Sequence, residues 1–101
     1  MDLFMIWPMD QFYKDYEKLE PIGHGQYGEV FSAKPLSKKI QESVNSSIVA
    51  VKFLKCKRAS EKLRIRDEID ILKDLHHDNI LKLLGAYEQN DEFIEVLEYL
   101  R

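Results

Sequence analysis

Short apolar runs along the chain predict several β-strands. Residues 48–54 (IVAVKFL) are rich in β-branched side chains and lie between Ser and Lys clusters, which is typical of a buried strand. Two further runs, 80–88 (ILKLLGAYE) and 92–100 (EFIEVLEYL), are separated by QND, which predicts a strand, a turn and a returning strand. Residues 16–22 (YEKLEPI) and 29–33 (EVFSA) flank a glycine-rich stretch and are predicted to form a β-hairpin.

One segment has helical spacing. Ser60 offers an N-cap hydroxyl and Glu61 an acid in the first turn, so we expect a helix from there to about residue 75. Spacings of three and four place a carboxylate on its apolar face, which consists of Ile65, Glu68, Leu72 and Leu75. A carboxylate in an apolar stripe requires a partner. Residues 34–47 lack sustained periodicity, and we expect a solvated loop with room for a helical turn.

These elements predict an α+β fold in the order β-β-β-α-β-β, with a five-stranded antiparallel sheet and one main helix. The 101 residues are 45% hydrophobic, which suffices for the core of one small domain, assigned here to residues 16–101. Residues 1–15 are interpreted as an upstream segment. Its apolar opening has Asp2 where an export signal carries Lys or Arg, and it is far shorter than a membrane span of about 18 residues. Disorder and docking of Trp7 on the domain both remain open.

Charge and cysteine content exclude several classes of function. The net charge is −3 and basic residues are interspersed with acidic ones, so we expect neither a nucleic-acid partner nor a membrane-binding patch. Cys56 is the single cysteine, which excludes an internal disulfide and a multi-cysteine metal site. We expect an inert thiol and a cytoplasmic location.

Three glycines, Gly23, Gly25 and Gly28, spell G-x-G-x-x-G. In a dinucleotide-binding fold the third glycine opens a helix, whereas here residues 29–31 continue as a strand. A P-loop is excluded because no G-K-[ST] follows. Two interpretations remain for the glycines alone: a merely tight hairpin, or a hairpin that folds over phosphates with its backbone N–H groups close to the anion.

Residues further along the chain, taken together with the glycines, resemble the signature of a known family. Residues 49–52 read VAVK, Lys52 lies 22 positions after Val30, and Glu68 lies 16 after Lys52. This set resembles the protein-kinase signature of G-x-G-x-x-G-x-V, V-A-I-K and a helix glutamate. Residues 16–101 are similar to the smaller N-terminal lobe and hinge of eukaryotic protein kinases.

The resemblance implies an ATP site. Lys52 would hold the α- and β-phosphates, and Glu68 would pair with Lys52, which accounts for the carboxylate on the apolar helix face. The glycine loop would cover the phosphates with Gly23, His24, Gly25, Gln26, Tyr27 and Gly28. Leu72 and Leu83 resemble members of the hydrophobic stack of active kinases. The adenine would contact the apolar side chains of Ile22, Val30 and Ala50, the back-pocket residue Leu97, and the hinge backbone at Glu98, Tyr99 and Leu100.

Short sequence segments predict the branch of the family, tyrosine or serine/threonine kinase. GQYGEV, VAVKFLK and LLGAY resemble tyrosine kinases of the growth-factor receptor type, in which the chain would be intracellular; Tyr87 stands where these usually have cysteine. A serine/threonine kinase is the alternative.

Nothing in the chain resembles H-R-D-x-x-x-x-N, D-F-G or A-P-E, which supply the catalytic base and the magnesium ligands. We therefore expect ATP binding without phosphate transfer by this chain alone, with Mg²⁺ and a protein substrate engaged only by a parent with the larger lobe. A second hypothesis is a non-catalytic module that binds nucleotide, or a partner through the face that would meet that lobe.

Overall fold

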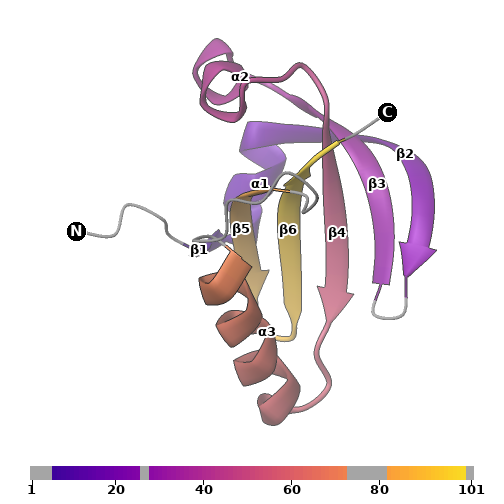
Figure 1. Ribbon diagram of the computed structural model, residues 1–101, viewed down its shortest axis with the longest axis vertical. Coiled ribbons are helices and arrows are strands. Elements are labelled where there is room, and N and C mark those ends of the chain that lie inside the picture. The colour runs from indigo at the N-terminus through magenta and orange to yellow at the C-terminus, as the bar shows by residue number, and fades with distance from the viewer. Residues whose placement is uncertain (1–5, 26–27, 73–81, 100–101) are drawn as a thin grey trace.

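The computed structural model describes residues 6–25, 28–72 and 82–99, with the side chains of His24, Glu68, Asp70, Ile71 and Leu72 left undescribed. Figure 1 shows a curved sheet with helices around it. The elements in chain order are β1 (Ile6–Pro8), α1 (Met9–Asp15), β2 (Tyr16–Gly25), β3 (Gly28–Pro35), α2 (Lys38–Val44), β4 (Val49–Lys55), α3 (Ala59–Leu72), β5 (Leu83–Gln89) and β6 (Glu92–Glu98).

The sheet has six strands in the order β1-β5-β6-β4-β3-β2. The strands from β2 to β6 pair with one another in antiparallel orientation, which confirms the predicted α+β fold. The short strand β1 pairs in parallel with β5, so that the sheet is mixed and has one strand more than predicted. A three-residue strand is too short to show the alternation from which a strand is predicted.

Residues 6–15, predicted as an upstream segment, form β1 and α1 in the structure. Phe12 of α1 is fully buried, and Met9 is buried beside it. The Phe12 ring contacts the rings of Tyr16, Phe53 and Tyr87, with centroids 5.5 to 5.8 Å apart. This segment therefore contributes a central side chain to the core.

The helix α2 lies in the stretch expected to be a solvated loop with room for a helical turn; the helical part is seven residues long and is not wholly solvated, because Val44 is buried. Both ends are capped: the Ser37 hydroxyl accepts a hydrogen bond from the Ile40 N–H at 3.1 Å, and Asn45 adopts a left-handed conformation with φ 54°. Val44 is buried and Ile40 packs against the same core. Seven residues are too few for a clear helical period.

The sheet separates two apolar clusters because successive side chains of a strand point to opposite sides. One side, called the α1 face, is covered by α1 and α2; its buried cluster is Met9, Phe12, Tyr16, Ala33, Val44, Val49, Val51, Tyr87, Ile94 and Val96. The other side, called the α3 face, is covered by α3; its buried cluster is Leu54, Cys56, Ile65, Ile69, Leu83, Ala86 and Phe93. Burial raises the pKa of the Cys56 thiol, which supports the expected inert role.

Candidate functional site

Four residues predicted to contact a nucleotide lie together on the α3 face. Val30 in β3 pairs with Lys52 in β4, and in the adjacent row Ala50 in β4 pairs with Leu97 in β6. Directly opposite residues of an antiparallel sheet project to the same side. The register therefore brings three apolar side chains and one ammonium onto one surface.

Part of this surface is accessible. Ala50 is buried, whereas Val30, Lys52 and Leu97 are half-buried. In the part of the chain that the structure describes, the Lys52 ammonium forms no hydrogen bond or ion pair. An uncommitted ammonium beside an apolar wall suits a ligand that has both an anionic and a flat apolar part, as ATP has.

The predicted partner of Lys52 is only partly described. Glu68 belongs to α3, but its side chain lies outside the description, as does that of Leu72. The pairing of Glu68 with Lys52 stays a prediction. Leu83, the other predicted member of the hydrophobic stack, is buried on the α3 face.

Two of the three glycines have different surroundings. A Cβ atom on Gly28 would lie 1.7 Å from the backbone oxygen of Phe53 in β4, so Gly28 is required by the close approach of two strands. A Cβ atom on Gly23 would meet nothing within 4 Å. The space beside Gly23 is therefore open, while Gly28 serves the packing of the sheet. Gln26 and Tyr27, predicted for the loop tip, lie outside the described residues.

The predicted adenine end is partly exposed. Ile22 is 42% exposed. A cavity of about 590 Å³ is bordered by Ile22, Ser32 and Tyr99, together with Glu17, Lys18, Leu19, Glu20 and Ile48. The Glu98 N–H donates to the Lys82 carbonyl at 3.0 Å, so Glu98 would offer a base its carbonyl oxygen. Leu100 lies outside the description.

The helix α3 is attached to the sheet by polar contacts that sequence reasoning missed. Arg66 of α3 forms an ion pair with Glu88 of β5, and the Lys62 ammonium donates to the Asn90 carbonyl at 2.8 Å. The partners are 22 and 28 positions apart, so no local pattern reveals them. Since Glu68 lies on this helix, the position of α3 decides whether Glu68 reaches Lys52.

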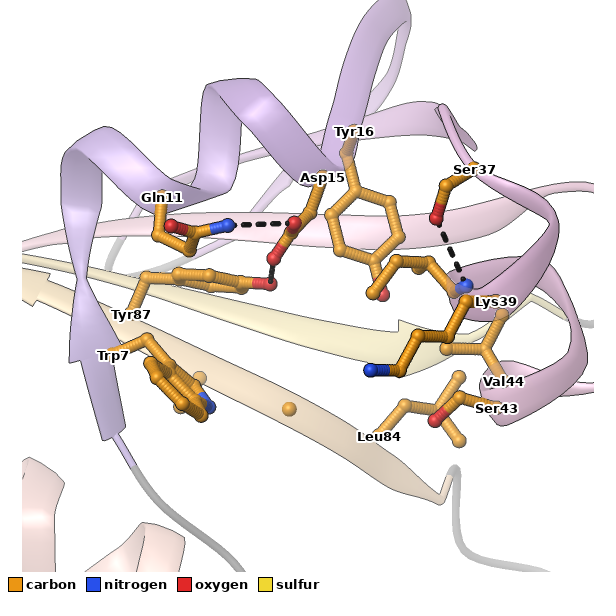
Figure 2. Close-up of a pocket in the computed structure, with 13 residues that line it drawn as sticks. Trp7, Gln11, Asp15, Tyr16, Ser37, Lys39, Ser43, Val44, Leu84 and Tyr87 are labelled. Carbon is orange, nitrogen blue, oxygen red and sulfur yellow. Dashed lines mark hydrogen bonds between the residues drawn. The ribbon is translucent and has the colours of Figure 1, made fainter.

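A second cavity, of about 500 Å³, lies on the α1 face (Figure 2). Within it the Tyr87 hydroxyl donates to the Asp15 carboxylate at 2.8 Å, and the Gln11 amide donates to the same carboxylate at 2.9 Å. Burial, and next the hydrogen bond with Asp15, raise the pKa of Tyr87. Sequence reasoning noted Tyr87 only as a departure from the receptor pattern; here it ties β5 to α1.

None of the helices in the described part of the chain is long and apolar enough to cross a membrane. Within the same part, no three His, Cys, Asp or Glu side chains are grouped as ligands for a metal ion.

The family model described as protein kinase domain matches residues 16–101. This match covers most of the chain, which therefore belongs to the protein kinase domain family and has the fold of its N-terminal lobe. The chain is similar to calcium-dependent protein kinase 3 of Plasmodium yoelii yoelii, at 36% identity over 89% of the chain and 15% of that protein. It is also similar to serine/threonine-protein kinase 1 of Arabidopsis thaliana, at 36% identity over 83% of the chain and 9% of that protein.

The inactive tyrosine-protein kinase 7 of Homo sapiens is 33% identical over 90% of the chain and 9% of that protein. Among solved structures, the C. elegans twitchin kinase region has the same fold, with a TM-score of 0.80 and 24% identity over 96% of this chain and 16% of that one. The chain thus spans 9 to 15% of the curated relatives named here. These relatives include serine/threonine and inactive tyrosine kinases, so the substrate type is not resolved by similarity.

Proposed function

We propose that this chain is the ATP-binding part of a protein kinase, in which Lys52 holds the nucleotide phosphates and the apolar residues of the α3 face contact the adenine. The observation that carries the proposal is the sheet register, which brings Val30, Ala50, Lys52 and Leu97 onto one face. The open backbone at Gly23 supports the glycine hairpin as the cover of the phosphates.

The proposal is tested by calorimetric titration of the chain with ATP and Mg²⁺. We expect saturable binding, and at least a tenfold weaker affinity in Lys52→Met, because the ammonium that faces the phosphates is removed. Lys55→Met is the matched control, since Lys55 is an exposed lysine of the same strand that lies on the α1 face. Equal binding by the wild type and Lys52→Met, or no binding by either, would contradict the proposal.

Phosphate transfer is assigned to a parent protein that also supplies the catalytic base and the Mg²⁺ ligands. For the isolated chain with ATP, Mg²⁺ and a mixed peptide library, we expect no peptide phosphorylation. Phosphorylation that disappears in Lys52→Met would overturn this assignment and would show that the chain is catalytic on its own.

We further propose a tyrosine substrate for the parent, supported by the phrases GQYGEV and VAVKFLK. The coding sequence downstream of residue 101 tests this most directly. An aromatic or arginine pattern of the tyrosine-kinase type after an H-R-D motif would support it, and an H-R-D motif without that pattern would reject it.

A further inference from the structure

The cavity on the α1 face, between α1, α2 and β5, lies apart from the proposed nucleotide site (Figure 2). Its volume of about 500 Å³ is within the range of small-molecule sites, which is about 300 to 1,000 Å³. Lys52 projects to the opposite side of the sheet, since its neighbour Val51 belongs to the α1-face cluster. A ligand in this cavity would therefore bind independently of a nucleotide held by Lys52.

An irregularity in β5 borders this cavity. The pairing of β5 with β6 shifts by one residue between Leu83 and Gly85, which makes Leu84 an extra residue, as in a β-bulge. Leu84 packs against the apolar cluster of the α1 face. A Cβ atom on Gly85 would meet nothing within 4 Å, so close packing does not require a glycine there. The missing side chain of Gly85 instead leaves room beside the strand.

Three hydrogen-bond donors of the cavity have no partner among the described residues. They are the Trp7 indole N–H, the Tyr16 hydroxyl and the Lys39 ammonium. Figure 2 shows Lys39 extending from α2 into the cavity and the Tyr16 hydroxyl pointing toward the same space. Burial, with a further contribution from the Asp15 charge, raises the pKa of Tyr16 to about 12, so its hydroxyl keeps its proton and can donate.

The carboxylate that borders the cavity is already engaged. Asp15 Oδ1 accepts a hydrogen bond from the Gln11 amide at 2.9 Å, and Asp15 Oδ2 accepts one from the Tyr87 hydroxyl at 2.8 Å. These two bonds stabilise the Asp15 charge within the protein. The hydrogen-bonding capacity left for a ligand is therefore mainly that of donors. An indole N–H and an ammonium can only donate, so they suit an acid group, which has acceptor oxygens.

Trp7 supplies the apolar part of the site. Its side chain is 48% exposed, although an indole ring is a large apolar surface. Trp7 pairs with Tyr87 across β1 and β5, and this places the two aromatic residues on the same side of the sheet. An accessible ring beside a few convergent polar groups is the usual composition of a small-molecule site.

We propose that the cavity between α1, α2 and β5 binds a small aromatic acid. The ligand class is a planar ring system that carries a carboxylate or a phosphate monoester. Its ring would lie against Trp7, and its acid group would accept hydrogen bonds from Lys39 and Tyr16. The absent side chain of Gly85 provides the space that the ring occupies.

The test is an NMR titration of the isotope-labelled chain. Trp7 is the single tryptophan, so its indole N–H gives one signal that reports directly on the cavity. Naphthoate and naphthyl phosphate are the probes, and their relative affinities distinguish the two acid groups. We expect at least one of them to shift the Trp7 signal saturably, with a Kd below about 1 mM. No saturable shift with either probe overturns the proposal.

Probes of different charge test the chemical class of the ligand. Naphthylmethanol has the same ring system without a charge, and naphthylmethylamine carries a positive charge. We expect both to bind at least about threefold more weakly than the better of the two acids, because they lack the attraction between the acid group and the Lys39 ammonium. Equal or tighter binding of the alcohol or the amine overturns the proposal.

Two neighbouring lysines provide a matched pair of variants. Lys39→Met is expected to weaken binding of the acid about three- to tenfold, because the ammonium beside the acid group is removed. Lys38→Met is the control, since Lys38 is also an exposed lysine of α2 but is not among the residues that line the cavity. Both side chains are exposed, so we expect both variants to fold. Equal effects of the two substitutions overturn the proposal.

Gly85→Leu tests the position of the ring. The added side chain enters the open space beside β5, and we expect it to abolish the saturable shift of the Trp7 signal. Circular dichroism checks that the variant is folded, and if it is not, the two lysine variants still decide the outcome. A folded Gly85→Leu that binds the acid as tightly as the wild type overturns the proposal.

Discussion

The two faces of the sheet have different compositions. The α1 face is dominated by aromatic rings: Phe12 contacts Tyr16, Phe53 and Tyr87, and Phe31 contacts Phe53 with centroids 5.5 Å apart. The α3 face carries mostly aliphatic side chains, together with the ionisable residues Lys52 and Glu95. Figure 1 shows the strands between α1, which is drawn behind β5, and α3, which lies beside the ends of β5 and β6.

The difference teaches how one thin sheet can provide both a stabilising core and room for the proposed ligand site. Rings that interlock on the α1 face bury much apolar area, which is the main stabilising contribution in a small domain. The α3 face is then able to keep half-buried positions and charges that contribute little to stability. Because alternate residues point to opposite faces, Val51 packs in the core of the α1 face while its neighbour Lys52 projects to the face of the proposed site.

The strongest challenge to this division is Phe12→Ala. Truncating this fully buried ring leaves a large cavity in the α1 face, and we expect a loss of about 3 to 5 kcal/mol in the free energy of unfolding. Tyr13→Ala is the control, since Tyr13 is the adjacent aromatic residue of α1 and is 56% exposed. Urea unfolding measures both variants, and Phe12→Leu serves if Phe12→Ala is unfolded. Equal stability of the Phe12 and Tyr13 variants would show that α1 is not part of the core.

Gly28 and Gly23 belong to the same hairpin, and their substitution tests whether packing and the proposed ligand site depend on different glycines. Gly28→Ala forces a methyl group against the Phe53 carbonyl, and we expect a loss of at least about 1 to 3 kcal/mol in unfolding free energy. In Gly23→Ala the methyl group has open space, so stability is expected to change by less than about 1 kcal/mol. Thermal unfolding of the two variants tests this. A Gly23→Ala variant that is as unstable as Gly28→Ala would contradict the assignment of separate roles.

Loss of the hydrogen bond between Tyr87 and Asp15 is expected to have a smaller effect on the free energy of unfolding. Tyr87→Phe removes the donor but keeps the ring, and we expect a loss of about 1 to 2 kcal/mol because the acceptor is a carboxylate. Tyr13→Phe, the same change at an exposed position, is expected to be neutral. Chemical unfolding at neutral pH measures the difference. A neutral Tyr87→Phe would mean that this bond does not hold α1 on β5.

The smallest effect is expected in alkaline solution. Burial, with a further contribution from the Asp15 charge, raises the pKa of Tyr16 from 10.0 to about 12. Between these values the unfolded chain ionises first, so the stabilising contribution is complete below pH 10 and is lost as the pH rises toward 12. After allowance for solvent screening we expect a decrease of roughly 1 kcal/mol in unfolding free energy. Tyr16→Phe should show a shallower decrease, and identical profiles would reject the assignment.

Much of the fold was predictable because its strands are long enough to show their pattern. IVAVKFL and EFIEVLEYL are apolar runs bounded by turn residues, and the structure has strands at both places. The elements α1, α2 and β1 were not predicted. Each is seven residues or shorter, and their apolar residues acquire meaning only through contact with the sheet.

The candidate site was predictable in part for a different reason. The motif spacing identified Lys52 and the glycines. Side chains two residues apart in a strand project to the same side, which places Ala50 and Lys52 together. Glu95 was not singled out. It alternates with Ile94 and Val96, and such alternation is typical of a strand with one solvated side. Here residues of α3 pack on the same side of the sheet, and the Glu95 side chain is buried.

The sequence by itself determined the family, the main strand segments and the residues proposed to bind ATP, because these follow from local spacing and residue type. Only the tertiary structure decided which residues share a face, because register depends on pairing between strands far apart in the chain. Through that pairing, Lys52 has Val30 on one side and Glu95 on the other. The same pairing makes Gly28 a packing residue, since the strand it approaches begins 21 positions later, at Val49.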